Sequence, residues 1–340
     1  MNTSATTDPP PNGKAATLDD VAARAGVSTA TVSRFVNNPS VVAEGTAARI
    51  REAIAATGYI PNLLAGGLAS SRSKMVAVLI PYLIDSIFND TMQAMVEELS
   101  AAGTTVMLGL TGVSESRTED LIRAALSRRV DAIIFTGPMT PQVEQMVQRS
   151  PALFIQVWEL PDNPIGIAVG FSHRDAGRDI AQFIVSRGYR RPHLVTAEGA
   201  RAQMRRAGFV EQWQATGKGA LSESSVEVPS RFGHARRIFA EIRRMPELPD
   251  VVVCGSDQLA QGMIVEAITS GLRVPDDIAV IGFGNSTIAG EMRPTITSVE
   301  VDGSRIAREA IAAIRRHSAQ EPLRDRWIDV GCRLIARESA

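Results

Sequence analysis

The sequence lacks the features on which exported and membrane proteins depend. Only two cysteines occur in 340 residues, Cys254 and Cys332, and both lie in apolar runs. They are expected to be reduced thiols, as in a cytoplasmic protein, rather than a disulfide framework. No apolar run reaches the roughly 18–20 residues of a membrane span. The first 15 residues have no apolar segment of the kind found in secretion signals. The sequence therefore predicts a cytoplasmic protein without membrane contact.

Patterns of catalytic and metal-binding residues are also missing. The four histidines show no metal-ligand spacing: His173, His193, His234 and His317. No G-x-S-x-G, P-loop or G-x-G-x-x-G sequence follows a strand-like run. Because neither a nucleophile nor an acid/base pair can be nominated, the sequence predicts no enzyme, cofactor or metal. A sugar-acting enzyme remains an alternative, and an assay for turnover of the ligand by the purified protein would detect it.

Charge is nearly balanced overall but unevenly distributed. The net charge of −1 argues against a broadly basic coat for nucleic acid. Between Lys14 and Lys74, however, seven Lys and Arg residues outnumber four acids, for a local net charge of +3. A small basic segment on a neutral body fits local contact with DNA rather than charge-driven coating.

Residues 17–37 have the pattern of two short helices joined by a tight turn. Gly26 can adopt the left-handed conformation that ends a helix, and Ser28 is a good N-cap for the next one. The second helix, 28–37, buries Val32 and Phe35. It leaves five residues for contact with DNA: Thr29, Ala30, Thr31, Ser33 and Arg34. Small polar side chains and an arginine suit the major groove, whereas an ordinary αα-hairpin is the alternative.

Three further segments belong to the N-terminal part of the chain. Residues 1–16 are polar and rich in proline, which predicts a disordered tail. Residues 42–57 predict a third helix ended by Gly58, so that 17–61 form a DNA-binding head. Residues 62–74 are rich in Gly, Ser and Ala and predict a hinge. Two glycines in it each disfavour a helix by about 1 kcal/mol relative to alanine.

From residue 75 to 340, short apolar runs alternate with helix-length segments. Seven runs are typical of buried strands: 75–80, 105–110, 132–135, 153–157, 193–196, 251–254 and 278–283. Buried strands alternating with helices predict parallel sheets with helices on both faces. The units are too many for one compact sheet, so we predict two doubly wound parallel-sheet subdomains with a cleft between them. The helix at 304–318 and the strands after Trp327 should return across the cleft.

Ligands bind such sheets at the carboxyl ends of the strands. Polar or aromatic residues follow several predicted strands: Tyr82, Asp85, Trp158, Glu159, Asp257 and Asn285. The order of strands therefore predicts a small-molecule site at this edge.

The motifs together give the chain a family resemblance. It resembles the head of LacI-family transcriptional regulators in TLDDVAARAGVSTATVSRFVNNP, GYIPN and NLLAGGLAS. It resembles their core, which is similar to periplasmic binding proteins, in IAVGFSHRDAGR, VVVCGSDQLAQG, GLRVPDDIAVIGF and RPTITSVEVD. The resemblance covers residues 17–338. It implies a DNA-binding regulator, a repressor, whose operator affinity is controlled by a small effector. VSRFVNNP, IAVGF and EMRPTITSV are most similar to the gluconate-repressor subgroup.

The resemblance assigns residues to the effector site. Arg205 matches an arginine that grips polar groups of the effector, and Asp257 matches an aspartate that accepts from its hydroxyls. Gln156 stands where sugar-binding members carry an aspartate, and Arg201 where smaller side chains are commoner. Both departures favour an anion, so the expected effector is a sugar acid, gluconate or a phosphorylated or keto relative. A neutral sugar is the alternative.

Two other side chains complete the effector site, Tyr82 and Phe88, of which Phe88 aligns with a residue that walls it. Structural alternatives stay open: surface exposure for Arg205, a helix N-cap for Asp257, and core packing for Phe88 and Trp158.

The resemblance also implies a homodimer on a pseudo-palindromic operator, with helix 28–37 in the major groove of each half-site. Leu68 matches a leucine that wedges into the minor groove when the hinge folds on DNA. The sequence leaves open dimer or tetramer, the exact effector, the operator, and whether effector releases or promotes DNA binding. A sugar-binding receptor with the same core is a less favoured alternative, since it predicts a signal peptide and no DNA-binding head.

Overall fold

The computed structural model describes residues 15–61, 73–83, 87–137, 139–323 and 325–340. The chain divides into two compact units, Met1–Ser73 and Lys74–Ala340, called here the head and the core. Leu68 lies outside the described residues, so its role as a wedge stays a prediction.

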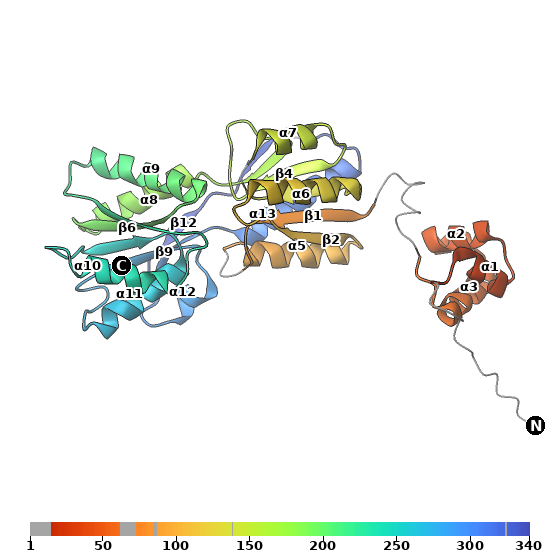
Figure 1. The fold of residues 1–340 in the computed structure, drawn as a ribbon, viewed down its shortest axis with the longest axis horizontal. Coiled ribbons are helices and arrows are strands. Elements are labelled where there is room, and N and C mark those ends of the chain that lie inside the picture. Colours follow the sequence, from red (N-terminus) through yellow and green to blue (C-terminus); the bar gives the residue numbers. More distant parts are fainter. Residues whose placement is uncertain (1–14, 62–72, 84–86, 138, 324) are drawn as a thin grey trace, which may run out of the picture. The chain divides into compact units, whose positions relative to one another are not determined.

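The head consists of α1 (Leu18–Ala25), α2 (Thr29–Asn37), the 3-10 turn η1 (Pro39–Val41) and α3 (Glu44–Thr57) (Figure 1). A capping box of Thr17 and Asp20 begins α1, and Gly26 ends it with φ 63°. The Ser28 hydroxyl accepts from the Thr31 amide, which confirms Ser28 as the N-cap of α2. The third helix begins two residues later than the sequence predicts, because η1 and an extended Val42 precede it.

A small apolar core joins the three helices of the head. Its buried members are Val21, Ala22, Ala25, Val32, Phe35, Ala47, Ile50 and Ala53. The Arg51 guanidinium lies over the Phe35 ring at 5.6 Å. Because Val32 and Phe35 point inward, the opposite face of α2 is left to solvent.

The first half of the core is a parallel sheet, here the N-terminal subdomain. Its strands are β1 (Met75–Ile80), β2 (Thr105–Leu110), β3 (Ala132–Phe135), β4 (Leu153–Val157), β5 (Ile167–Gly170) and β11 (Trp327–Asp329). They lie in the order β11-β5-β4-β3-β1-β2. Alternate residues of each strand face opposite layers. One layer is α5 (Asn89–Ala101) with α13 (Gly303–Ser318), and the other is α6 (Glu115–Ser127) with α7 (Pro141–Gln148) (Figure 1).

The second sheet forms the C-terminal subdomain. Its strands are β6 (Pro192–Ala197), β7 (Ser222–Val226), β8 (Val251–Cys254), β9 (Ala279–Phe283), β10 (Thr297–Glu300) and β12 (Arg333–Ile335). The order is β12-β10-β9-β8-β6-β7, and β12 alone pairs antiparallel. Its helices are α8 (His173–Ser186), α9 (Ala200–Ala215), α10 (His234–Ile242), α11 (Asp257–Thr269) and α12 (Thr287–Glu291).

Three segments connect the two sheets, as the sequence predicts. The chain leaves the first sheet after β5, returns through α13 to β11 beside β5, and then ends at β12 beside β10. This confirms two doubly wound subdomains. Among the helices in the described parts of the chain, none is long and apolar enough to cross a bilayer.

Helices α8 and α9 touch through glycine. A Cβ built on Gly177 would lie 2.0 Å from the Arg205 carbonyl oxygen, and one on Gly208 would lie 1.9 Å from that of Arg174. The helix backbones are therefore in direct contact, which only glycine permits. This contact sets the position of Arg205 relative to the start of α8.

Replacing Gly208 with alanine is expected to lower the free energy of unfolding of the core by roughly 1–3 kcal/mol, as overpacking does. Gly290 in α12 is the matched control, because its Cβ position meets nothing within 4 Å. Gly290→Ala should be neutral or should stabilise by up to ~1 kcal/mol. Urea denaturation of both variants measures the difference, and equal effects would contradict the close contact.

Candidate functional site

Aromatic rings from both subdomains meet at the carboxyl ends of the strands. Phe88, directly before α5, packs edge-on against Trp158 after β4, with ring centroids 5.3 Å apart. Trp158 contacts Phe171 after β5 at 6.1 Å. Phe171 in turn lies 6.2 Å from Phe283, the last residue of β9. The rings form one apolar floor that continues from the first sheet to the second.

Arg205 extends from α9 over this floor. Its guanidinium carbon lies 4.0 Å from the centroid of the Phe283 ring, and Nη1 donates to Nδ1 of His173 at 3.1 Å. Among the residues that the structure describes, no carboxylate lies within ion-pair distance of Arg205. Burial, and then the charge of Arg201, lower the pKa of Arg205 to about 10. The site thus holds a desolvated cation that no acid of the described chain neutralises.

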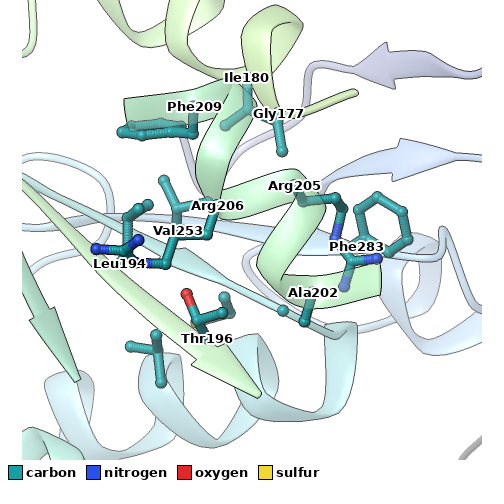
Figure 2. A pocket seen from close by; sticks show the side chains of 13 residues that line it. Gly177, Ile180, Leu194, Thr196, Ala202, Arg205, Arg206, Phe209, Val253 and Phe283 are labelled. Carbon is teal, nitrogen blue, oxygen red and sulfur yellow. The ribbon is translucent and has the colours of Figure 1, made fainter. Parts of the chain in front are cut away.

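A small cavity adjoins this arginine. Figure 2 shows Arg205 and Phe283 side by side, at one end of a space bounded by α8, α9, β6 and β8. Its volume is about 30 Å³, and most of its lining is apolar, including Ile180, Phe209 and Val253. The space suffices for a water molecule or two, so it is a gap beside Arg205 rather than a site for a sugar.

His173, the first residue of α8, is buried between two partners. Its Nε2 lies 2.9 Å from the carbonyl oxygen of Trp158, and its Nδ1 faces Arg205. Arginine has no acceptor, so Nδ1 must accept and Nε2 must carry the proton that is donated to the carbonyl. Burial, followed by the charges of Arg205 and Arg201, lowers the pKa of His173 to about 2. The ring is therefore neutral at physiological pH.

Arg201 lies one turn before Arg205 but has a counter-charge. Its Nε lies 3.3 Å from Oε2 of Glu159, and the side chains of both residues are 17% exposed. The guanidinium also lies 5.6 Å above the Phe88 ring. Burial lowers the pKa of Arg201, and Glu159 opposes that change. Because Glu159 follows β4, the ion pair joins the two subdomains.

Asp257 begins α11 and already accepts three hydrogen bonds. Its Oδ2 accepts from the amide and hydroxyl of Ser286 at 2.6 and 2.9 Å, and its Oδ1 accepts from the Ser298 hydroxyl at 2.5 Å. Burial raises the pKa of Asp257, and these bonds counteract it. The N-cap of α11 is Ser256, so the cap role left open for Asp257 belongs to its neighbour. The carboxylate joins α11 to the segments beyond β9.

Three adjacent strands of the first sheet end next to polar atoms that have no partner. Buried side-chain atoms without a hydrogen bond among the described residues include the Tyr82 hydroxyl after β1, the Thr136 hydroxyl after β3, and Nε1 of Trp158 after β4. Each such group costs about 1–3 kcal/mol when it stays unpaired. Burial also raises the pKa of Tyr82. This edge of the sheet is suited to a ligand with several polar groups.

Gln156 is buried in β4 and has a local partner. Its Oε1 accepts from the Ile165 amide at 3.2 Å, which ties the end of the β4–β5 loop to the sheet. Its contact with an effector stays a prediction.

On the head, the five residues predicted to contact DNA lie on α2 and differ in exposure, and their contact with DNA stays a prediction. Ala30 and Arg34 are exposed, while Thr29, Thr31 and Ser33 are half-buried. The Thr31 hydroxyl lies 2.9 Å from that of Ser28, and the Asn37 side chain donates to the Ser33 carbonyl. The face therefore consists of small side chains around one free-standing arginine.

Comparisons with known proteins agree with this architecture. Residues 17–62 match the family model of bacterial regulatory proteins, lacI family, and residues 181–340 match a periplasmic binding protein-like domain. The HTH-type transcriptional regulator GntR of Pseudomonas aeruginosa is 33% identical over 331 residues, which is 95% of each chain. This chain belongs to the LacI family. It is a DNA-binding transcriptional regulator rather than an enzyme.

Two further relatives extend the match. The HTH-type transcriptional regulator GntR of Escherichia coli is 30% identical, with 91% of this chain and 95% of the relative covered. A solved LacI-family regulator from Silicibacter pomeroyi superposes with a TM-score of 0.88 at 27% identity, covering 95% and 99% of the two chains. The fold of this LacI-family core is thus that of its relatives.

The structure brings some predicted residues together and adds others. Phe88, Arg201 and Arg205 share one cluster, and Gly284 lies between Ile87 and Asp257, which brings Asp257 close to it. Sequence reasoning placed Glu159 at this edge but did not pair it with Arg201, and it missed His173, Phe171 and Phe283. The position of His173 just after a buried strand was the available signal.

Two buried histidines predict a loss of stability in acid. His193 in β6 lies between the hydroxyls of Ser222 and Ser224, and burial lowers its pKa to about 4. The unfolded chain takes up a proton near pH 6.5 at each of these histidines, whereas the folded chain does not. The full free energy of unfolding is therefore present above that pH. It falls as the pH is lowered, by about 2 kcal/mol per histidine at pH 5. Urea denaturation at pH 7 and pH 5 should show this loss, and His173→Asn should remove roughly half of it. A pH-independent midpoint would contradict the burial of neutral histidine.

Proposed function

We propose that the chain is a repressor whose operator affinity is controlled by an anionic sugar acid, gluconate or a close relative. The observation that carries this is Arg205, a desolvated guanidinium with no acidic partner among the described residues. A half-buried cation that is desolvated and has no counter-charge costs stability. A ligand carboxylate would supply the counter-charge and could bind the guanidinium in a two-pronged contact.

The second arginine narrows the charge of the ligand. Glu159 already matches Arg201, so the site has one unmatched cation rather than two. A single carboxylate balances one cation better than a doubly charged phosphate does. This balance favours gluconate or a keto relative over a phosphorylated sugar acid, and the motif resemblance to the gluconate-repressor subgroup supports the same choice.

The unpaired polar atoms support a ligand with many hydroxyls. The Tyr82 and Thr136 hydroxyls and Nε1 of Trp158 can donate to them, and Asp257 keeps room for a further hydrogen bond on Oδ1. Phe88 would cover an apolar face of the carbon chain. Gln156 is uncharged and would therefore not repel the carboxylate of the ligand.

On DNA, we infer a homodimer that places α2 in the major groove of each half-site. Thr29, Ala30 and Arg34 would select bases, and Thr31 and Ser33 would contact phosphates. An exposed apolar face on the N-terminal subdomain supports a second copy. It comprises Val96 on α5 and Leu108 and Leu110 on the edge strand β2, which are 40%, 44% and 40% exposed.

Replacing Arg34 with alanine should weaken binding to the operator by roughly 1–3 kcal/mol and relax the choice at one base position. An operator selected from a random DNA pool and a scrambled duplex serve as the two probes. Arg24→Ala on α1 is the control, because a phosphate contact there would weaken both duplexes alike. An unchanged operator-to-scrambled ratio in the Arg34 variant would reject the assignment.

Replacing Arg205 with alanine should lower affinity for gluconate roughly 100-fold, since hydrogen bonds to charged groups are worth about 1.5–3 kcal/mol. Affinity for D-glucitol, which has a neutral CH₂OH in place of the carboxylate, should change little. Arg206→Ala is the matched control, because Arg206 is the next residue of α9 and pairs with Glu223.

Calorimetry on the three proteins gives these affinities, and operator binding with and without gluconate gives the response, expected at about 5–150-fold. A wild type that prefers D-glucitol would reject the sugar acid in favour of a neutral effector and leave DNA binding untouched.

A further inference from the structure

The two arginines of the effector site are held in different ways. Arg201 pairs with a carboxylate, Glu159, whereas Arg205 donates to an uncharged imidazole nitrogen of His173. A carboxylate beside a guanidinium satisfies its hydrogen bonds and also cancels its charge. A neutral acceptor satisfies a hydrogen bond and leaves the charge intact. The residue next to each arginine therefore decides how much attraction remains for an anion.

Contacts with Trp158 and Phe171 fix the position and the tautomer of His173. The Trp158 carbonyl accepts from Nε2, and the Phe171 ring packs against the imidazole with centroids 4.4 Å apart. Trp158 itself has φ 70°, a left-handed backbone conformation that is uncommon for a large side chain. Its amide donates to Val169 on β5, which holds it in place. Nδ1 is thus presented to Arg205 as a fixed acceptor.

We propose that His173 is a positioning residue that makes the site selective for anions. As a neutral acceptor it fixes the Arg205 guanidinium over Phe283 without cancelling its charge. Because Trp158 belongs to the N-terminal subdomain and Arg205 to the C-terminal one, His173 also joins the two subdomains. The inference rests on the proposed function, in that the ligand it selects is the sugar acid bound by Arg205.

Two nearly isosteric variants test the charge of the acceptor. In His173→Asn and His173→Asp, an oxygen can take the place of Nδ1, neutral in the first and negative in the second. Both variants lose the bond to Trp158, so they differ mainly in charge. The Asn variant should keep gluconate affinity within about fivefold of the wild type. The Asp variant should bind gluconate with roughly 100-fold lower affinity, while its affinity for D-glucitol should change little.

The ratio of gluconate to D-glucitol affinity is the readout that a merely structural role would not move. Equal losses in the Asn and Asp variants, or a retained ratio in the Asp variant, would overturn the proposal. His173→Gln separates the second bond, because its amide can reach the Trp158 carbonyl but not the Nδ1 position. In the Gln variant, the ratio of gluconate to D-glucitol affinity should fall further than in the Asn variant.

A measurement without effector separates this inference from the proposed function. In ¹⁵N-histidine-labelled protein at pH 7, Nδ1 of His173 should be unprotonated, and its signal should shift in Arg205→Ala. A protonated Nδ1 would overturn the proposal whatever the effector is. An unprotonated, Arg205-dependent Nδ1 in a protein that binds no gluconate would reject the sugar acid alone and support the contact between His173 and Arg205.

Discussion

The core of this regulator depends on keeping one guanidinium charged in a partly apolar site. Arg205 lies against Phe283 and donates to a neutral histidine, and no described carboxylate neutralises it. Such an arrangement costs stability and persists only because the surrounding structure enforces it. The glycine contact between α8 and α9 enforces it, because Gly177 and Gly208 allow the helix carrying Arg205 to lie directly against the helix that begins at His173. In the proposed function, a ligand anion would supply the counter-charge that the described chain does not provide.

The same contacts cross between the two subdomains. The Glu159–Arg201 pair and the hydrogen bond from His173 to Trp158 both link the edge of the first sheet to the second. An effector can change DNA affinity only if it binds two arrangements of the subdomains with different affinity. If the effector acts by rotating the subdomains, as proposed, the contacts that join the subdomains are those that would change. The charge chemistry of the site and the contacts between the subdomains therefore rest on the same few side chains.

Local patterns in the sequence anticipated most elements. Ser28 as the N-cap of α2, Gly26 and Gly58 as left-handed helix ends, and the seven strand runs all follow from short-range chemistry. The prediction that all seven strands are buried was wrong for β2, which lies at the edge of the sheet with only Gly109 buried. The strand β7 was not predicted because SESSV at a sheet edge has no apolar run, and two of its five residues are exposed. The start of α3 was misplaced because residues 39–41 form a 3-10 turn, which propensity alone does not separate from a first helical turn.

By itself, the sequence determined the helical head and the alternation of strands and helices, since these follow from local spacing and residue type. The family resemblance, rather than local spacing, placed two arginines near one strand edge. Only the tertiary structure decided which partner each arginine has. Glu159 and His173 lie 42 and 32 residues from Arg201 and Arg205, and no local pattern links them. Whether a cation keeps its charge for a ligand depends on what folding brings within about 3 Å of it, and chain order does not specify that.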